Sequence, residues 1–303
     1  MLSAAAGLLI FSVVMQPPTD TSAAKAAILA AEHALIDATR AKGALAFLDA
    51  LEPGAAVLFP GQPIHSAASA RAPFMARYGG TSVYTWEPAH VVVSADANVG
   101  CAVGWSSFRF TFADDTVPRM YPGAYETCWR RGVDAVWRIV AHQRADMLAP
   151  GAPPVPGAAK LKKSPHSATV SLPGDQRAET QDTDMAFATF AVDSGTGRAF
   201  ARFAAPDVVN VMFQTYGPVE MEALFVNYPG RLTLLWKPMR EYGVASGGLG
   251  FNVGHSVLKR LDGGPEFHGK FLTIWRQNAD GSWSYIFDLG SPQECRRFEW
   301  RLC

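Results

Sequence analysis

The sequence has few cysteines, no net charge and none of the short motifs that mark several enzyme classes. Four cysteines occur in 303 residues and no two form a C-x-x-C pair, which speaks against a zinc ribbon and a thioredoxin-type redox site. Lys and Arg together number 27, as do Asp and Glu, so the formal net charge of +0 creates no field that attracts nucleic acid or an anionic membrane. H-E-x-x-H and G-x-S-x-G are also missing. We therefore expect no metal, no cofactor and no nucleic-acid partner.

The N-terminal apolar run is shorter than a membrane span. It extends from Ala4 to Met15 and breaks at Pro17, whereas a spanning helix needs about 20 apolar residues. The run instead matches the core of a signal peptide, and small residues at Thr21 and Ala23 provide a cleavage site after Ala23. A buried first helix is the alternative, because no Lys or Arg precedes the run. We expect export to the periplasm or the medium, with no membrane association once the signal is removed.

The chain contains an internal duplication. Trp86 in "TWEP" and Trp236 in "LLWKP" are 236 − 86 = 150 positions apart, and the segments 99–108 and 249–258 align at the same offset with four identical residues. Further on, 123–137 aligns with 269–283 at an offset of 269 − 123 = 146. The four residues missing from the second copy fall in a hairpin turn, where length changes disturb the register of the strands least.

Each copy has helical periodicity first and strand-like segments afterwards. Ile28, Ala31, Leu35 and Ala38 follow helical spacing in the first copy, and longer strands are expected near 83–94, 98–112, 121–131 and 135–145. This order is typical of an α+β layer fold. A Pro-, Ala- and Ser-rich stretch separates the copies and reads as a linker. The expected organisation is a signal peptide at 1–23, a first domain at 24–147, a linker at 148–180, a second domain at 181–291 and a tail at 292–303.

A G-x-Y-x-x-x-W-x(7)-W pattern, Gly123, Tyr125, Trp129 and Trp137, ends the first copy, and the second keeps it with Phe at the Tyr position. With this order of elements the chain resembles the SnoaL-like or DUF4440 branch of the NTF2-like superfamily. The resemblance implies two cone-shaped domains, each a curved antiparallel sheet wrapped around its N-terminal helices and leaving an apolar cavity. Its relatives include ketosteroid isomerase, polyketide cyclases and dehydratases, and proteins that only bind or assemble.

Isomerase chemistry requires a carboxylate base on the short strand after the first helices. At that place the two copies have 59–61, "FPG", and 213–215, "FQT", with no Asp or Glu. This departure argues against isomerase activity.

Two matched positions are candidates for catalysis. At an offset of 146, His142 on the last strand corresponds to Asp288, and titratable groups at matched positions of two cavities are what proton transfer would use. The alternative is a pair of strand-end polar residues that face water. Trp105 and His255 correspond at an offset of 150, so both or neither should line a cavity; His255 is a third catalytic candidate or a structural His. The expected ligand-binding residues are Trp105, Tyr125, Phe59, Phe213 and Phe271.

Trp86 and Trp236 are expected to be structural. A Trp at the start of a strand can cover one end of the core, and the following Pro, which has no N–H to donate, belongs at the start or edge of a strand.

The turn length of the second copy predicts that His255 lies opposite Phe271. Carried to the first copy, the same register places Trp105 opposite Tyr125.

This register predicts which cysteines can form a disulfide. It places Cys101 and Cys128 on opposite faces of the sheet, so both should stay reduced. Cys295 and Cys303, with seven residues between them, are then the expected disulfide.

Three functions remain open. The first is an exported tandem protein that binds a small, largely apolar ligand in its cones. The second is a cavity enzyme of cyclase, dehydratase or isomerase type that uses His142, Asp288 or His255. The third is an assembly module whose sheet faces pair, within the chain as a pseudo-dimer or between chains as a homo-oligomer.

Overall fold

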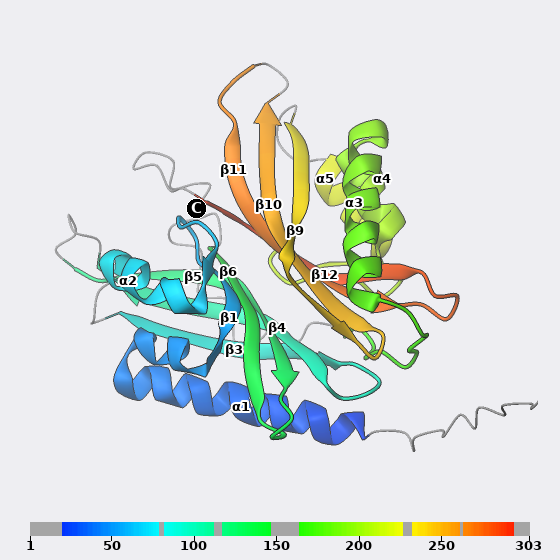
Figure 1. The fold of residues 1–303 in the computed structure, drawn as a ribbon. Helices are drawn as coiled ribbons and strands as arrows, with labels where there is room; N and C mark the ends of the chain where they lie inside the picture. Colours follow the sequence, from blue (N-terminus) through cyan, green and yellow to red (C-terminus); the bar gives the residue numbers. More distant parts are fainter. Residues whose placement is uncertain are drawn as a thin grey trace, which may run out of the picture.

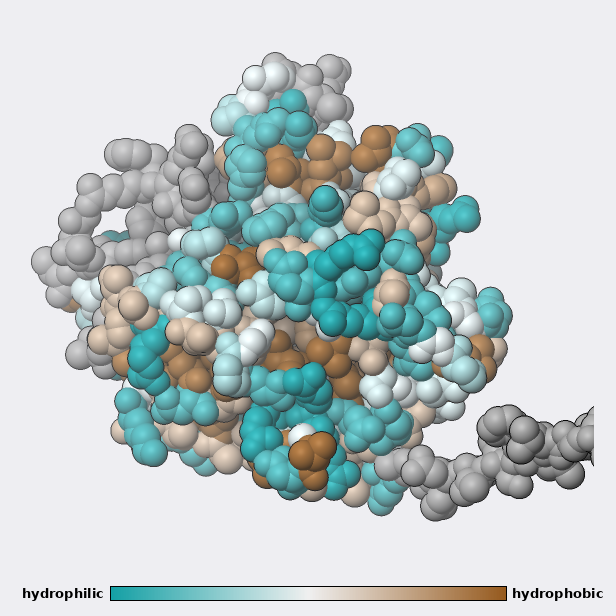
Figure 2. Space-filling view, in the orientation of Figure 1, coloured by the Kyte–Doolittle hydropathy of each residue, from teal (hydrophilic) through white to brown (hydrophobic). Residues whose placement is uncertain are grey.

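The computed structural model describes residues 20–78, 82–111, 117–146, 164–226, 232–260 and 263–293. Residues 1–19 of the predicted signal peptide and most of the predicted tail lie outside these residues. Within the described part of the chain, no helix is long and apolar enough to cross a membrane. Hydrophilic and hydrophobic residues are interspersed over the face shown in Figure 2.

The first domain contains helices followed by a six-stranded sheet, as the sequence predicted. The sheet order is β2-β1-β6-β5-β4-β3; β1 is parallel to β6, and the other pairs are antiparallel. The elements are α1 (Thr21–Lys42), η1 (Ala44–Ala50), β1 (Leu51–Leu58), β2 (His65–Ser66), α2 (Ala67–Tyr78), β3 (Val83–Val93), β4 (Val99–Phe110), β5 (Arg119–Arg131) and β6 (Trp137–Asp146).

The second domain repeats this plan with a four-stranded antiparallel sheet in the order β12-β11-β10-β9. The counterpart of β1 is the two-residue strand β7, which pairs with β8 in a separate small sheet. The elements are α3 (Gln176–Ser194), α4 (Thr196–Phe203), β7 (Val209–Asn210), β8 (Thr215–Tyr216), α5 (Gly217–Val226), β9 (Leu232–Ser246), β10 (Leu249–Arg260), β11 (Phe267–Gln277) and β12 (Trp283–Pro292).

The first helix of each domain starts and stops at recognisable residues. The Asp20 carboxylate caps α1 by accepting from the backbone N–H groups of Ser22 and Ala23, and Gly43 ends the helix with a φ of 85°. Asp175 caps α3 in the same way, and Gly195, with a φ of 94°, follows it. Cleavage after Ala23 would remove the cap and the first residues of α1; that cleavage stays a prediction.

The repeated Trp-x-Pro steps lie on edge strands, as expected. Both β3 and β9 form the edge of their sheet, and each pairs with its neighbour through an irregular register beside the proline. Pro88 lies opposite Gly104 and Pro238 opposite Gly254. A Cβ atom on Gly104 would collide with the Glu87 carbonyl oxygen, and one on Gly254 with the equivalent carbonyl of β9. The duplicated glycines are therefore required by the bulged backbone.

The two sheets pack against each other, with the helices on the outside. Figure 1 shows the sheets between α1 and α3. One hydrophobic cluster joins residues of both sheets, including Val103 and Leu272. Across this seam Gln143 Nε2 lies 3.4 Å from the Lys270 carbonyl oxygen, and the ring of His90 lies 5.9 Å from that of Phe287. The remaining face of each sheet packs on helices and forms a separate core within its own domain.

Two equivalent turns meet where the domains join. Asp96 lies in the turn between β3 and β4, and Ser246, at 96 + 150, lies at the turn between β9 and β10. The Ser246 hydroxyl donates to the Asp96 carboxylate, and Ala95 N–H donates to the Gly247 carbonyl oxygen at 2.8 Å. Contact between equivalent positions is what a twofold axis relating the two copies would produce.

The predicted register is wrong by one residue in both hairpins. Trp105 pairs with Ala124 instead of Tyr125, and His255 pairs with Lys270. Both hairpins have the same one-residue error because the register of the first copy was taken from the turn length of the second. Since side chains alternate between faces, a shift of one residue exchanges the faces.

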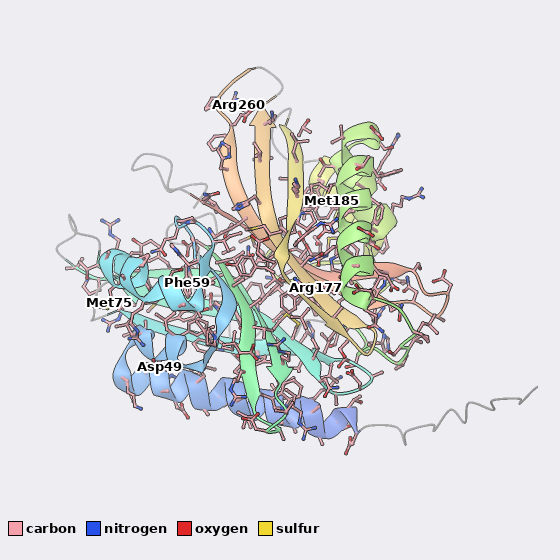
Figure 3. All side chains as sticks on the ribbon, viewed as in Figure 1. Asp49, Phe59, Met75, Arg177, Met185 and Arg260 are labelled. Atoms are coloured by element: carbon pink, nitrogen blue, oxygen red, sulfur yellow. A yellow bond between two sulfur atoms is a disulfide. The ribbon has the colours of Figure 1, made fainter. Side chains whose placement is uncertain are left out.

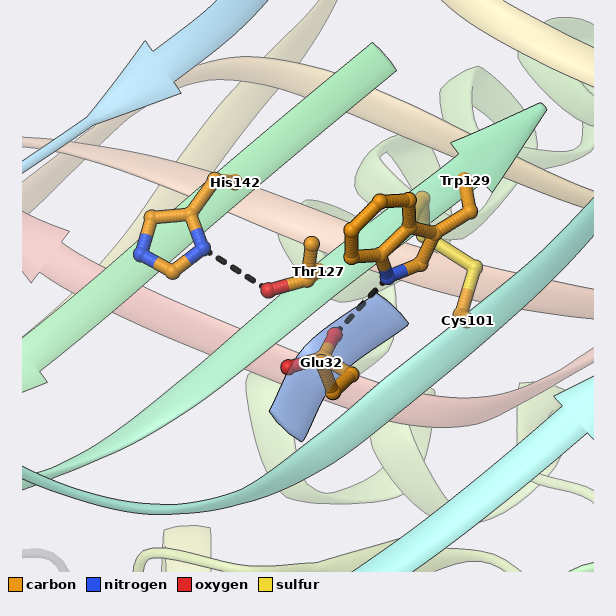
Figure 4. The surroundings of a disulfide bond; sticks show 6 residues. Glu32, Cys101, Thr127, Trp129 and His142 are labelled. Carbon is orange, nitrogen blue, oxygen red and sulfur yellow. Dashed lines mark hydrogen bonds between the residues drawn. A yellow bond between two sulfur atoms is a disulfide. The ribbon is translucent and has the colours of Figure 1, made fainter. Parts of the chain in front are cut away.

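The cysteine prediction is wrong for the same reason. Cys101 lies directly opposite Cys128, and the two form a disulfide across β4 and β5, beside the core of the first domain in Figure 4. Cys295 and Cys303 lie outside the described residues, so their pairing stays a prediction.

The described end of the predicted linker is held by both domains. Ala168 N–H donates to the Val93 carbonyl oxygen at 3.1 Å, and Leu172 N–H donates to the side chain of Gln277 at 3.0 Å. Helix α3 begins at Gln176, five residues before the predicted start of the second domain. The segment 164–175 therefore packs on the protein instead of only connecting its halves.

Candidate functional site

A carboxyl group on the first helix of each domain is buried under tryptophan. In the first domain this group is Glu32, on the apolar face of α1 beside Ile28 and Leu35. Trp86 and Trp129 both donate their indole N–H to it, the latter at 2.8 Å (Figure 4). Burial raises the pKa of Glu32 to about 7, and the indole hydrogen bonds oppose that rise.

The second domain has an equivalent carboxyl group at Asp184 on α3. Trp236 donates its indole N–H to Asp184 at 3.0 Å, as the equivalent Trp86 does to Glu32. The second indole donor is replaced by Asn252, whose amide donates at 3.1 Å. Burial raises the pKa of Asp184 to about 7. Each tryptophan of the duplicated motif thus donates a hydrogen bond to a buried acid.

His142 lies at the centre of the first domain. Its side chain is 0% exposed, so the interpretation as a water-facing residue is wrong. Its Nδ1 lies 2.8 Å from the Thr127 hydroxyl and its Nε2 lies 3.0 Å from the Tyr84 hydroxyl, with the Phe47 ring 4.3 Å away. Burial lowers the pKa of His142 to about 3, with a smaller effect of Arg144, so the imidazole is neutral.

Asp288 occupies the equivalent place in the second domain. Thr127 pairs with His142 in β5 and β6, and the duplicated Thr273 pairs with Asp288 in β11 and β12. The Thr273 hydroxyl donates to Asp288 Oδ1 at 2.6 Å. Burial raises the pKa of Asp288 to about 6. The correspondence between His142 and Asp288, drawn from the offset of 146, is therefore confirmed in position.

Asp184 and Asp288 belong to one row of polar side chains. Asn252, Thr273 and Asp288 are direct neighbours on β10, β11 and β12. Asn252 connects the row to Asp184, and the negative charge of Asp288 contributes to the raised pKa of Asp184. Two carboxyl groups with pKa values near neutrality thus share the interior of the second domain.

Aromatic rings fill the interior of the first domain. Phe59 points toward α2, where its ring lies 5.1 Å from that of Phe74 (Figure 3), and it also lies 5.4 Å from the His142 ring. Tyr84 is 0% and Trp86 is 4% exposed. The named rings are therefore buried and packed against one another.

The equivalent positions of the second domain are more accessible. Leu234 replaces Tyr84, and Leu234, Trp236 and Asp288 are each partly exposed. Phe213, expected from the sequence to contact a ligand, is 38% exposed. The two copies therefore differ in the exposure of equivalent residues.

The predicted ligand-binding residues divide between two faces. Tyr125 and Phe59 lie in the core of the first domain, and Phe271, equivalent to Tyr125, is buried in the second. Trp105, in contrast, packs in the seam between the sheets, and the equivalent His255 is exposed. Neither Trp105 nor His255 lies inside a cone, a correction that follows from the register.

The sequence reasoning missed Glu32 and Asp184. Glu32 carries a weak signal, since it lies between Ile28 and Leu35 on the apolar face of its helix. Asp184 carries none, because the buried face of α3 also contains Thr180 and Gln181. Across the described ranges, no group of three or more His, Cys, Asp or Glu residues is arranged to hold a metal ion.

The described residues define two α+β domains in tandem. No family model and no curated protein matches the chain. The solved structures to which it is similar include a ketosteroid isomerase-like protein from Erwinia carotovora atroseptica SCRI1043, with 16% identity, 41% of this chain and 95% of that chain covered, and a TM-score of 0.34.

Two further similar structures are of the same kind. An NTF2-like superfamily protein from Salmonella enterica serovar Typhimurium LT2 has 15% identity, with 42% of this chain and 92% of that chain covered and a TM-score of 0.32. An NTF2-like protein with a cystatin-like fold from Novosphingobium aromaticivorans has 17% identity, with 41% and 86% covered and a TM-score of 0.33. Each match spans about two-fifths of this chain, and the matched proteins are of the NTF2-like kind that the sequence motifs predicted.

Proposed function

We propose that the protein binds a small, largely apolar molecule inside its second domain. The observation that carries this proposal is the difference in exposure between equivalent positions. Tyr84, Trp86 and His142 are buried, whereas Leu234, Trp236 and Asp288 are partly exposed. These three positions lie on equivalent long strands of the two domains, and at two of them the side chain differs: Leu234 replaces Tyr84 and Asp288 replaces His142. An apolar interior with a few placed polar groups is the usual form of a small-molecule site.

The first domain then supports the second without binding a ligand. Its aromatic rings occupy the interior in which a ligand would lie, with ring centroids about as close as in ordinary aromatic packing, such as 5.9 Å between Phe47 and Phe59. This narrows the sequence-based hypothesis, which gave both cones a ligand.

Native mass spectrometry of protein purified from its host tests the proposal. We expect a co-purifying small molecule that is lost in Leu234→Trp, because the larger ring fills the open interior. Val192→Trp is the matched control, since Val192 is 60% exposed on the same domain. A ligand retained in Leu234→Trp at wild-type occupancy would contradict the proposed site.

Proton transfer is a second candidate function, favoured by Asp184 and Asp288. Their pKa values of about 7 and about 6 suit general acid–base catalysis near neutral pH. Asp288→Asn should then lower turnover by about 10²-fold with unfolding unchanged. His142, enclosed on all sides by described residues, serves packing in either case. Wild-type activity that survives Asp288→Asn would exclude this mechanism.

We also propose that the chain is exported and that its two sheets act as permanent partners. The apolar run before Pro17 and the Cys101–Cys128 disulfide support export, because disulfides persist in oxidising compartments. The shared core of the two sheets supports a monomer, since the faces that could pair between chains are paired within one. N-terminal sequencing from the native host and analytical ultracentrifugation test the two statements; an intact Met1 in the cytosol, or a stable dimer, would contradict them.

A further inference from the structure

Asp288 indicates which ligands the second domain selects. We propose that the ligand is an apolar amine, whose ammonium group pairs with the Asp288 carboxylate. This proposal rests on the ligand site proposed above.

Asp288 is the accessible member of the polar row. Asn252 and Asp184 are 0% exposed and Thr273 is 2% exposed, whereas Asp288 keeps part of its surface accessible. The Thr273 hydroxyl occupies one carboxylate oxygen, Oδ1, at 2.6 Å and fixes the group on the inner face of β12. A ligand in the interior would therefore meet a positioned carboxylate with a second oxygen to offer.

The charge of Asp288 is not balanced within the described protein. None of the ion pairs among the described residues includes Asp288, and the Thr273 hydroxyl is the one influence that lowers its pKa. Burial is the main cause of the raised pKa values of Asp184 on α3, Tyr285 on β12 and Glu126 on β5, and the negative charge of Asp288 raises each of them further. Buried charges in proteins are normally paired, and a cationic ligand would supply the partner.

The surrounding rings suit the same ligand. Trp236 is partly exposed, and Phe187, whose ring lies 4.6 Å from that of Trp236, belongs to the same core. Aromatic rings attract ammonium groups and also cover an apolar body. In the first domain the equivalent of Asp288 is the neutral His142, so the closed copy contains no such charge at this position.

Three naphthalene probes of similar size separate charge from shape. We would measure the Kd values of 1-naphthylmethylamine, 1-naphthalenemethanol and 1-naphthoate by titration calorimetry at pH 7.5. We expect the amine to bind about 10-fold or more tightly than the alcohol, and the carboxylate to bind weakest. The preference for the amine should weaken as the pH falls through about 7, where Asp184 becomes protonated, and disappear below about 6, where Asp288 becomes protonated.

Asp288→Asn should bring the affinity for the amine to that for the alcohol, both measured on the variant. Asp182→Asn removes one charge from an exposed position of α3 and should leave the preference intact. If Asp288→Asn does not fold, Asp288→His provides the same test, because His142 occupies the equivalent register position. Equal binding of amine and alcohol by the wild type would contradict the proposal that the ligand is an amine, but not the proposed ligand site. No binding of any probe would overturn both.

Discussion

Removal of the Cys101–Cys128 disulfide should lower stability by a calculable amount. The bond closes a chain segment of 27 residues between adjacent strands, and the loop-entropy relation for that length gives about 3.5 kcal/mol at 25 °C. Both cysteines are 0% exposed and belong to the core that the sheets share. Removal of the disulfide should therefore destabilise the seam between the domains as well as the first sheet.

The perturbation is the double variant Cys101→Ala/Cys128→Ala, which leaves no unpaired thiol at the seam. For a chain of this size, a loss of about 3.5 kcal/mol corresponds to a Tm lower by roughly 7 to 14 °C. Calorimetry of protein folded under oxidising conditions measures the change, and urea unfolding gives the free energy independently. Wild-type protein that is unfolded and refolded in the presence of a reductant should have a Tm close to that of the double variant.

Thiol counting provides the decisive control. Alkylation of unreduced, denatured wild-type protein should leave both Cys101 and Cys128 unmodified. Modification of both, together with an unchanged Tm in the double variant, would refute the observed register as well as the stability argument.

Three further substitutions test the cores. His142→Ala should lower the free energy of unfolding by about 3 kcal/mol, through lost ring packing and the lost partner of the Thr127 hydroxyl; a urea-unfolding change under roughly half a kcal/mol would contradict this. Because the pKa of Glu32 is raised from 4.5 to about 7, its stabilising contribution is complete below pH 4.5 and is lost as the pH rises to about 7. Glu32→Gln should flatten that part of the stability profile, measured by calorimetry from pH 4.5 to 8, and an unchanged slope would count against the shift. Gly104→Ala should unfold or strongly destabilise the first domain, seen by circular dichroism, because the new Cβ meets the Glu87 carbonyl oxygen; wild-type unfolding would show that the bulge relaxes.

The two-domain architecture could be predicted from the sequence because the duplication repeats the same local sequence patterns in both halves. The spacing of Trp86 and Trp236 predicted two copies, and the offset of 146 predicted that His142 and Asp288 share a position. The strand expected near 83–94 is β3, Val83–Val93. These features depend on periodicity, which survives without knowledge of distant contacts.

The candidate site was less accessible because it depends on register and on burial. One residue of slip in the hairpin moved Trp105 from the interior to the seam and brought Cys101 to Cys128. Glu32 and Asp184 were missed since an acid on a helix is normally solvated, and only the tryptophans across the core show otherwise. The different exposure of equivalent residues arises from individual side chains, among them Tyr84 against Leu234, that no single motif records.

The contact between Asp96 and Ser246 shows what joining two copies in one chain permits. On the axis of a symmetric homodimer a residue meets its own copy, so Asp96 would face a second aspartate and be repelled. In the fused chain, one side of that contact is a serine that donates a hydrogen bond. Covalent linkage thus frees each half to change alone: one interior can remain closed and stabilising while the other opens, whereas every opening substitution in a homodimer would weaken both halves at once.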